Sequence, residues 1–148
     1  MVWKPNVTVA AVIEQDGKFL LVEELTEFGA RFNQPAGHVE PNESIAEAVI
    51  RETVEETTYG FEPSAVVGIY YWHYPNKNLT YLRFAFSGKV TTRETNRKLD
   101  KGIIRAVWLT KEAIQSMTAR HRSPLVNQCI NDYLDGKRYP LDLLTHYD

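Results

Sequence analysis

The sequence contains little that would support disulfide cross-links, membrane insertion or electrostatic binding to nucleic acid. Cys129 is the single cysteine among 148 residues, so an intramolecular disulfide is excluded. No hydrophobic run approaches the roughly 20 residues that a membrane-spanning helix requires. The formal net charge of -2 provides neither a basic field for a nucleic acid polymer nor a polybasic arm for a membrane surface.

The composition is that of an ordinary globular protein. Hydrophobic residues make up 43% of the chain and charged residues 24%, which excludes a disordered protein. The opening segment MVWKPNVTVA lacks the basic and then apolar layout of a secretory signal. We therefore expect a cytoplasmic protein with one domain over residues 1–148, present as a monomer or a weak homodimer.

The first half of the chain is predicted to contain a β-hairpin, a loop and a helix. The segment VTVAAVIEQDGKFLLVEE has two apolar runs around Asp16-Gly17, a pair that tolerates the positive φ of tight hairpins. LTEFGARFNQPAG, residues 25–37, is predicted to be a loop. A helix is predicted from Ser44 to Thr57, because Ser44 and Glu47 have the spacing of a capping box.

The second half is predicted to contain strands followed by helices. GIYYWHY and LTYLRFAFSGKV are rich in aromatic and β-branched residues and flank the turn PNKN, and IIRAVWL is a further strand. Helices are predicted from Thr110 and over residues 123–136, the latter with Ser123 as its cap. Strands that adjoin one another and also flank helices indicate an α/β or α+β layered fold with a mixed sheet.

The predicted helix carries an unusual group of acids. At 100° per residue, its core-facing side would consist of Ala46, Val49, Ile50 and Thr53. Glu52, Glu55 and Glu56 occupy a neighbouring stripe at positions i, i+3 and i+4. Arg51 lies four residues from both Glu47 and Glu55, so it can pair with either. One arginine does not balance this many carboxylates.

A hard divalent cation would supply the missing positive charge. Mg²⁺ takes oxygen ligands and is commonly held by one or two carboxylates together with substrate phosphate oxygens. The sequence has no Cys/His cluster that would indicate zinc. The alternative is a solvated acidic helix face, which is common on protein surfaces.

The residues around the acids resemble the Nudix box. Gly37 is followed after five residues by Glu43, and after seven more by Arg51-Glu52, with Glu55-Glu56 in register. Two positions depart from the pattern: Thr53 replaces an aliphatic residue, and Thr58 replaces the final glycine. That glycine ends the helix in a left-handed conformation. We expect Gly60 to take over this role and the loop after Glu56 to be altered.

The resemblance extends to KPNVTVA, FNQPAGHVE, RSPLV and GKRYPL, which are similar to segments of the NudJ-type phosphatases, a subgroup of the Nudix family. It implies an α/β/α sandwich with a mixed sheet and a loop–helix–loop box. It also implies Mg²⁺-dependent hydrolysis, with Mn²⁺ as a substitute, of small-molecule phosphates. The subgroup implies release of orthophosphate from nucleoside tri- and diphosphates, and activity on hydroxymethylpyrimidine pyrophosphate and thiamine pyrophosphate.

The resemblance also assigns roles to box residues. Glu52, Glu55 and Glu56 would bind the metal, and Ala36 would offer a backbone carbonyl. Glu52 is the expected general base, although some members of the family take the base from a loop outside the box. Arg51 would orient the carboxylates, and Glu43 would brace the loop or the start of the helix.

Residues outside the box are less strongly indicated. An additional acid of the metal site would be Asp100 or Glu94, and Asp100 fits a turn beside Gly102 equally well. The expected substrate contacts come from the segment before the box and from the aromatic strands: Phe32, Asn33, Gln34, Tyr70, Trp72 and Arg83. An aromatic ring there would stack on a nucleobase and the arginine would bind phosphate, although each aromatic residue would equally pack in the core.

Two other functions remain open on sequence grounds. The chain could be a Nudix hydrolase that cleaves ADP-ribose or another nucleotide sugar between its phosphates. It could also be a binding module that has lost catalysis, although that interpretation predicts missing box carboxylates and none is missing.

Overall fold

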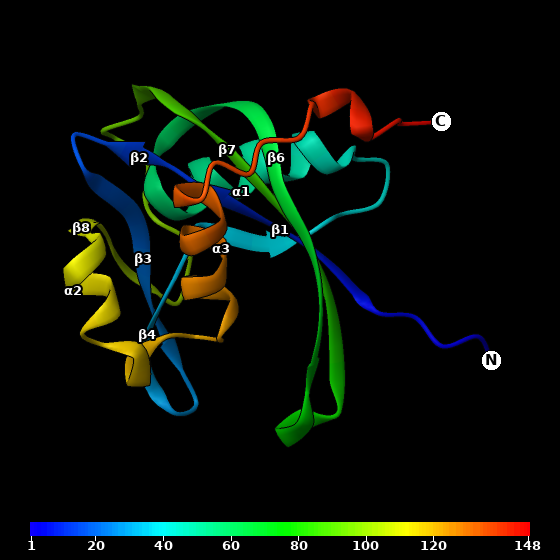
Figure 1. Cartoon of the computed structure of the whole chain (residues 1–148), viewed down its shortest axis with the longest axis horizontal. Helices are drawn as coiled ribbons and strands as arrows, with labels where there is room; N and C mark the ends of the chain where they lie inside the picture. Colours follow the sequence, from blue (N-terminus) through cyan, green and yellow to red (C-terminus); the bar gives the residue numbers. More distant parts are fainter.

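The computed structural model describes all residues from 1 to 148 and contains two β-sheets flanked by helices (Figure 1). The first sheet has the order β5-β1-β7-β6. Its strands are β1 (Asn6–Val12), β5 (Ala36–His38), β6 (Tyr59–Tyr74) and β7 (Leu79–Arg93). β1 and β7 run parallel, whereas β1 with β5 and β6 with β7 run antiparallel. This sheet is therefore mixed, as the sequence predicts.

The second sheet is built around β3 and is antiparallel throughout. Its strands are β2 (Glu14–Gln15), β3 (Lys18–Thr26), β4 (Gly29–Asn33) and β8 (Ile103–Thr110). The hairpin predicted at Asp16-Gly17 is confirmed: φ is 53° at Asp16 and 78° at Gly17, so both turn residues are left-handed.

The loop predicted over residues 25–37 is wrong, because this segment contains β4 and most of β5. The chain reverses after β3 through a short turn in which Thr26 Oγ1 donates to the carbonyl of Gly29 and accepts from the amide of Phe28. Gly29 has a φ of 98°, which glycine adopts without strain. The turn therefore brings β4 into register with β3. The sequence did not indicate this strand because β4 is short and lacks a strong alternation of apolar and polar residues.

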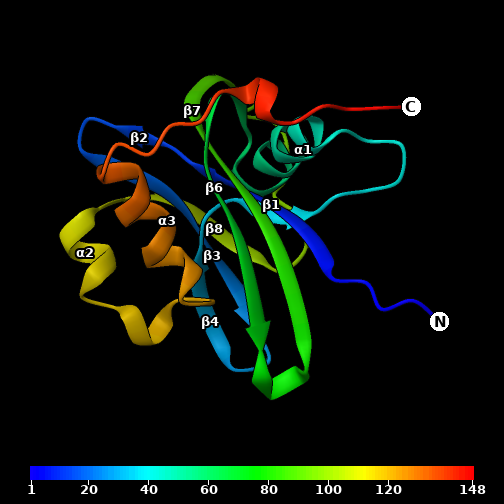
Figure 2. The same ribbon diagram turned by 45° about the vertical axis from the view of Figure 1, so that its right-hand side comes forward.

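The helices lie on both sides of the strands (Figure 2). α1 (Ile45–Thr57) packs on one side, and α2 (Lys111–Gln115) and α3 (Leu125–Leu134) lie on the other. The capping box of α1 is confirmed, and so is the helix predicted from Thr110, which is the N-cap of α2. The predicted cap of α3 is displaced by one residue: Pro124 is the N-cap, and Ser123 Oγ accepts from the amide of Leu125 at 3.2 Å.

Short 3₁₀ segments complete the connections: η1 (Pro75–Lys77), η2 (Thr118–Arg120) and η3 (Leu141–Leu143). Near the end of the chain, Tyr139 bridges β6: the amide and carbonyl of Val66 each pair with Tyr139 at 2.8 Å. This contact covers part of the outer edge of the first sheet.

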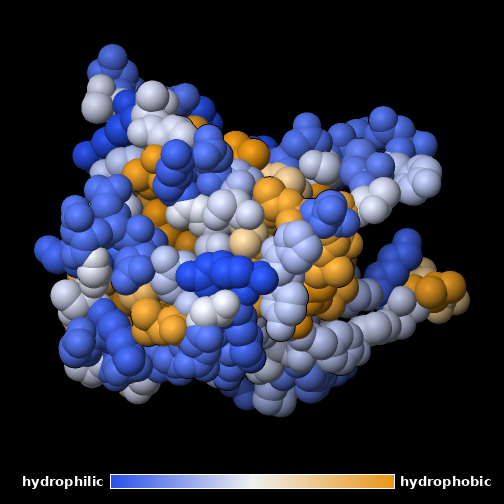
Figure 3. Space-filling view, turned by 45° about the horizontal axis from the view of Figure 1, so that its top comes forward, coloured by the Kyte–Doolittle hydropathy of each residue, from blue (hydrophilic) through white to orange (hydrophobic).

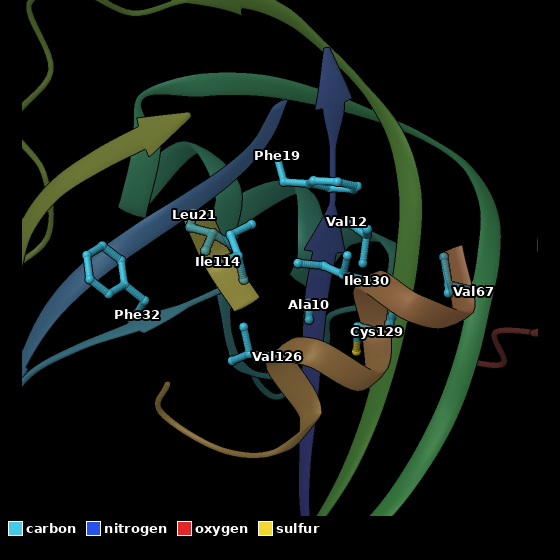
Figure 4. Packing of buried hydrophobic residues seen from close by; sticks show 11 residues of the cluster. Ala10, Val12, Phe19, Leu21, Phe32, Val67, Ile114, Val126, Cys129 and Ile130 are labelled. Atoms are coloured by element: carbon cyan, nitrogen blue, oxygen red, sulfur yellow. The ribbon is translucent and has the colours of Figure 1, made fainter. Parts of the chain in front are cut away.

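The apolar run of β1 is buried on both faces, which explains why it does not alternate with polar residues. Ala10 and Val12 face α2 and α3, where they join Val126, Cys129 and Ile130 (Figure 4). Their neighbours Val9 and Ala11 belong to the cluster on the α1 side. The two-residue period of the strand thus divides one sequence run between two cores. The α/β/α layering implied by the family resemblance is present.

The buried side of α1 differs from the predicted one by a rotation of the helix. Ala48, Val49 and Thr53 are buried, whereas Ile50 is 37% exposed and Ala46 is half-buried. Glu56 is also buried, at 8% exposure. The helix therefore turns part of its acidic stripe toward the sheet.

Polar side chains predominate on the face shown in Figure 3, with hydrophobic atoms emerging between them. The helices are too short and insufficiently apolar for any of them to cross a membrane.

The end of α1 shows how the departure at Thr58 is accommodated. Thr58 itself takes the left-handed conformation, with φ 68° and ψ 2°, and its amide donates to Val54 O at 2.9 Å. The prediction that Gly60 takes over termination is wrong, because Gly60 lies in β6 and has no positive φ. A β-branched residue in this conformation is strained. The helix end keeps the geometry of a glycine cap at a cost in free energy.

Replacing Thr58 with glycine should relieve that strain. We expect Thr58→Gly to raise the free energy of unfolding by about 1 kcal/mol, measured by denaturant titration. Thr58→Ala is the matched control, because it removes the same hydroxyl and methyl groups but keeps the Cβ. A gain in the alanine variant equal to that in the glycine variant would show that strain is not the cause.

Candidate metal and active site

The acids of α1 are held by a helix that is firmly anchored at its start and on its buried side. Ser44 Oγ accepts from the amide of Glu47 at 3.0 Å, and the Glu47 carboxylate accepts from the amide of Ser44 at 2.8 Å. Thr53 replaces the aliphatic residue of the motif, and its hydroxyl donates to Val49 O at 2.7 Å. This bond satisfies a polar group that is otherwise fully buried.

Arg51 lies at the centre of an acidic network. Its nitrogen atoms lie 2.6 Å from Glu43, 2.8 Å from Glu52, 3.1 Å from Glu55 and 3.2 Å from Glu40. It also donates to His38 O at 2.9 Å, which fixes the loop that precedes the helix. The pKa of Arg51 is raised above its ordinary value, mainly by the hydrogen bond to Glu43.

The expected pairing of Arg51 with Glu47 is wrong, because the Glu47 carboxylate is used at the helix cap. Glu43 instead receives two bonds from Arg51 and one from the amide of Glu40 at 3.0 Å. Glu43 therefore ties the loop to the helix, which is the bracing position that the sequence resemblance implies.

Gly37 provides the space in which Glu52 lies. A Cβ atom at position 37 would stand 2.2 Å from Cδ of Glu52 and 2.4 Å from both of its carboxylate oxygens. Such distances are far inside van der Waals contact. Any other residue at this position would displace Glu52.

Carboxylate oxygens from three residues converge at the end of this helix. Oxygens of Glu52, Glu55 and Asp100 all lie within 4.8 Å of one another. The amide of Asp100 donates to Glu55 O at 3.0 Å, so the backbone of the helix holds the loop in place. Of the two acids left open by the sequence, Asp100 is the one at the cluster. Glu94 points elsewhere: it is exposed and pairs with Arg97 at 3.4 Å.

Glu56 is a buried acid without a cationic partner. Its carboxylate accepts from the amide of Ala36 at 2.9 Å and makes no ion pair. Burial raises the pKa of Glu56 to about 9. Burial also raises the pKa of Glu52, although Arg51 opposes this shift. Two carboxyl groups are thus kept where their charged forms are poorly solvated.

These residues fit a hard divalent cation. The donors are carboxylate oxygens, the positive charge of Arg51 is shared among four acids, and Gly37 leaves Glu52 a place beside the loop. A cation would compensate the charge that burial otherwise disfavours. Glu52, Glu55 and Asp100 are the residues that the structure brings closest together, and Glu56 and Ala36 lie next to them.

A cavity of about 410 Å³, here called the acidic cavity, opens beside these carboxylates. Glu52 and Glu56 line it, whereas Glu55, Asp100 and Arg51 do not. The other lining residues come from several strands and from the start of α3: Thr8, Glu24, Asn33, Ala36, Gly37, His38, Glu40, Trp72, Tyr74, Tyr81, Arg83, Arg122, Ser123 and Leu125. Its size suits a small organic molecule.

Arg83 brings an uncompensated positive charge to the acidic cavity. Its side chain is buried at 7% exposure and donates to Asn33 Oδ1 and Gln34 Oε1, both at 3.0 Å. Neither amide carries a charge, and Arg83 makes no salt bridge. Gln34 in turn donates to Val126 O at 2.8 Å, which fixes its amide orientation. A guanidinium with neutral partners is available to an anion.

Two of the residues expected to contact substrate lie behind the cavity wall. Gln34 is 1% exposed and contacts Arg83 instead, and Phe32 belongs to the hydrophobic core. Tyr70 is also absent from the cavity, because its hydroxyl donates to Asp132 at 2.7 Å and its ring packs on the core. Asn33, Trp72 and Arg83 do line the cavity.

Several lining residues were missed from the sequence. Glu24 and Arg122, which pair at 2.8 Å, reach the acidic cavity from β3 and from the segment before α3. Tyr74 and Tyr81 come from the β6–β7 hairpin, in which Trp72 pairs with Tyr81. Alternation along these strands could have placed Trp72 and Tyr74 on one face. The pairing register was needed to add Tyr81.

Comparison with known proteins agrees with this geometry. The model of the NUDIX domain family matches residues 3–128. The chain belongs to the Nudix family. Phosphatase NudJ of Escherichia coli K12 is 38% identical over 146 residues, covering 99% of this chain and 94% of that protein. The phosphatase NudJ of Shigella flexneri has the same identity and coverage.

Solved Nudix structures share the fold. A NUDIX hydrolase from Nitrosomonas europaea is 56% identical, with a TM-score of 0.96 over 97% of this chain and 98% of that chain. A MutT protein from Methanosarcina mazei Go1, at 24% identity and a TM-score of 0.73 over 93% of this chain and 100% of its own, shows the fold alone. The Nudix chain described here is a hydrolase of phosphoric anhydrides.

The close approach of Gly37 to Glu52 can be tested directly. Gly37→Ala should displace the Glu52 carboxylate and lower kcat/KM by about 100-fold, as expected for a misplacement of about 1 Å at a reacting centre. Steady-state kinetics would measure the loss, and circular dichroism would check that the fold is retained. Normal activity in a folded Gly37→Ala protein would contradict the geometry at Glu52.

Proposed function

We propose that the protein is a Mg²⁺-dependent phosphatase that releases orthophosphate from nucleoside tri- and diphosphates and from related organic pyrophosphates. One observation carries the proposal: the carboxylates of Glu52 and Glu56 and the buried, uncompensated guanidinium of Arg83 line a single cavity of small-molecule size. The phosphate oxygens of a polyphosphate ester can bind a cation on the carboxylate side of the cavity and Arg83 on the other side. We further propose that residues 1–148 act as one domain, as a monomer or a weak homodimer.

Glu52, Glu55 and Asp100 are the proposed ligands of the cation, with Glu56 and the carbonyl of Ala36 completing the set. Mg²⁺, with Mn²⁺ as a substitute, would neutralise phosphate oxygens and lower the pKa of the attacking water. Arg51 holds Glu52 and Glu55 through its bonds at 2.8 and 3.1 Å. It makes no contact with the cavity, so we assign it a positioning role.

Glu52 is the proposed general base. Among the carboxylates of α1, it is the one that both lines the acidic cavity and bonds to Arg51. In the proposed reaction a water attacks the terminal phosphorus, the anhydride P–O bond breaks, and Glu52 takes the proton of the water. The bridging oxygen leaves with the remaining phosphate chain. Arg83 binds nonreacting phosphate oxygens through its free N–H groups.

The substrate class follows from the likeness to the NudJ phosphatases of Escherichia coli, which cover nearly the whole chain. We therefore place hydroxymethylpyrimidine pyrophosphate and thiamine pyrophosphate among the substrates, together with nucleoside tri- and diphosphates. In each, an anionic phosphate chain is joined to an organic group. The acidic cavity supplies both charged and aromatic walls for such a molecule.

Metal removal and product analysis test the activity. Excess EDTA should abolish phosphate release, and Mg²⁺ added beyond the chelator should restore it. With a nucleoside triphosphate, ion-exchange chromatography should detect orthophosphate and the diphosphate. Pyrophosphate and the monophosphate as products would contradict the phosphatase assignment, and preference for ADP-ribose would favour a nucleotide-sugar hydrolase. Undiminished release in chelator would contradict the metal requirement.

Glu56→Gln separates the function of this acid from its structural contact. The amide oxygen can still accept from Ala36, so the fold should be retained, while turnover should fall by at least about 100-fold, equivalent to ~2.7 kcal/mol in activation free energy.

The same variant tests how the free energy of unfolding depends on pH when a chelator removes metal ions. Folded Glu56 keeps its proton up to about pH 9, whereas an unfolded glutamic acid loses it near its ordinary pKa of about 4.3. The unfolded wild-type protein therefore binds fewer protons, and stability should fall as pH rises between about pH 5 and pH 9. Denaturant titrations should show a shallower fall in Glu56→Gln. Parallel curves would contradict the burial of an uncompensated acid.

A further inference from the structure

A second cavity of about 530 Å³, here called the side cavity, adjoins the acidic cavity. The two share four lining residues: Trp72, Tyr74, Arg122 and Ser123. The remaining lining residues of the side cavity are Thr118, His121, Pro124 and Asn127. No carboxylate lines it. The one arginine that lines it, Arg122, is already paired with Glu24 at 2.8 Å, so the side cavity offers little net charge to a ligand.

An aromatic row extends from one cavity to the other. The rings of Tyr81 and Trp72 are stacked with centroids 5.9 Å apart and an interplanar angle of 21°. Trp72 and Tyr74 are stacked at 5.2 Å and 15°. Trp72 and Tyr74 line both cavities, whereas Tyr81 lines the acidic cavity alone. Three nearly parallel rings on a paired hairpin provide a surface against which a flat ring can stack.

Asn127 brings an unused amide to the side cavity. Its Oδ1 atom is buried and has no hydrogen-bond partner, and its side chain forms no other hydrogen bond. The amides of Asn33 and Gln34, by contrast, are bonded to Arg83. A buried acceptor without a partner costs free energy, and rotation of the amide toward the side cavity would let a ligand satisfy it. An asparagine amide offers one acceptor and two donor hydrogens, and rotation can present either side.

The stacking surface of Trp72 and Tyr74 and the unpaired amide of Asn127 together match one kind of chemical group, a flat ring with a polar edge. We propose that the side cavity binds the heteroaromatic group of the substrate, a nucleobase or an aminopyrimidine, with the ring against Trp72 and Tyr74 and its polar edge on Asn127. The assignment rests on the proposed function, in which the phosphate chain occupies the acidic cavity between the box carboxylates and Arg83. The protein would then bind the organic group in the side cavity and hydrolyse the phosphate chain in the acidic cavity.

The kinetics of a variant in α3 can distinguish binding of the organic group from binding of the phosphate chain. Asn127→Leu should raise KM for a nucleoside diphosphate by about 10-fold, the loss expected for one hydrogen bond, with kcat nearly unchanged. The inhibition constant of inorganic pyrophosphate, which lacks an organic group, should not change. Asn131→Leu is the matched control: this residue is exposed one turn further along α3, lines neither cavity and should behave as wild type.

A binding measurement keeps the test independent of turnover. In chelator, ligand-detected NMR should show contact between the free nucleoside and the wild-type protein, and Asn127→Leu and Trp72→Leu should weaken it. If the two variants lose nucleoside binding and the wild-type protein releases no orthophosphate, the side-cavity assignment holds and the proposed phosphatase function is wrong. Unchanged KM and unchanged nucleoside binding in Asn127→Leu would overturn the side-cavity assignment and leave the phosphatase intact.

Discussion

The structure of the site depends on the shared ion pairs of Arg51. One guanidinium contacts carboxylates from the loop before α1 and from the helix itself, and also the carbonyl of His38 at the end of β5. Without it, Glu43, Glu52 and Glu55 would repel one another at close range. The pairing is partial, because one positive charge serves four acids. The same contact that holds the loop–helix unit together therefore leaves it in need of a cation.

The charge missing on the carboxylate side is matched by an excess at Arg83. This guanidinium is fixed by two amide oxygens, and one of those amides is itself anchored to α3 through Val126. A carboxylate in place of either amide would have neutralised the arginine and removed its affinity for anions. Neutral acceptors orient the group and leave its charge available to a phosphate.

The sequence was most informative where spacing along one segment determines geometry. The capping box, the Asp16-Gly17 turn and the convergence of Glu52 and Glu55 all depend on residues a few positions apart. Its predictions failed where the environment decides, as for the residues 25–37, which form strands, and for Ile50, which is exposed. Glu24 and Tyr81 were missed because strand register brings them to the site from distant segments. Asp100 could be named but not chosen over Glu94.

The bridge between Val66 and Tyr139 also affects how the folded protein can pair with other chains. β6 is the outermost strand of the first sheet, and its edge would otherwise present unpaired amide and carbonyl groups. The two bonds from Tyr139 occupy this edge near its middle. Removing the last ten residues would uncover a template for intermolecular strand pairing. The terminal segment thus blocks strand pairing at this edge, and none of its residues lines the acidic cavity.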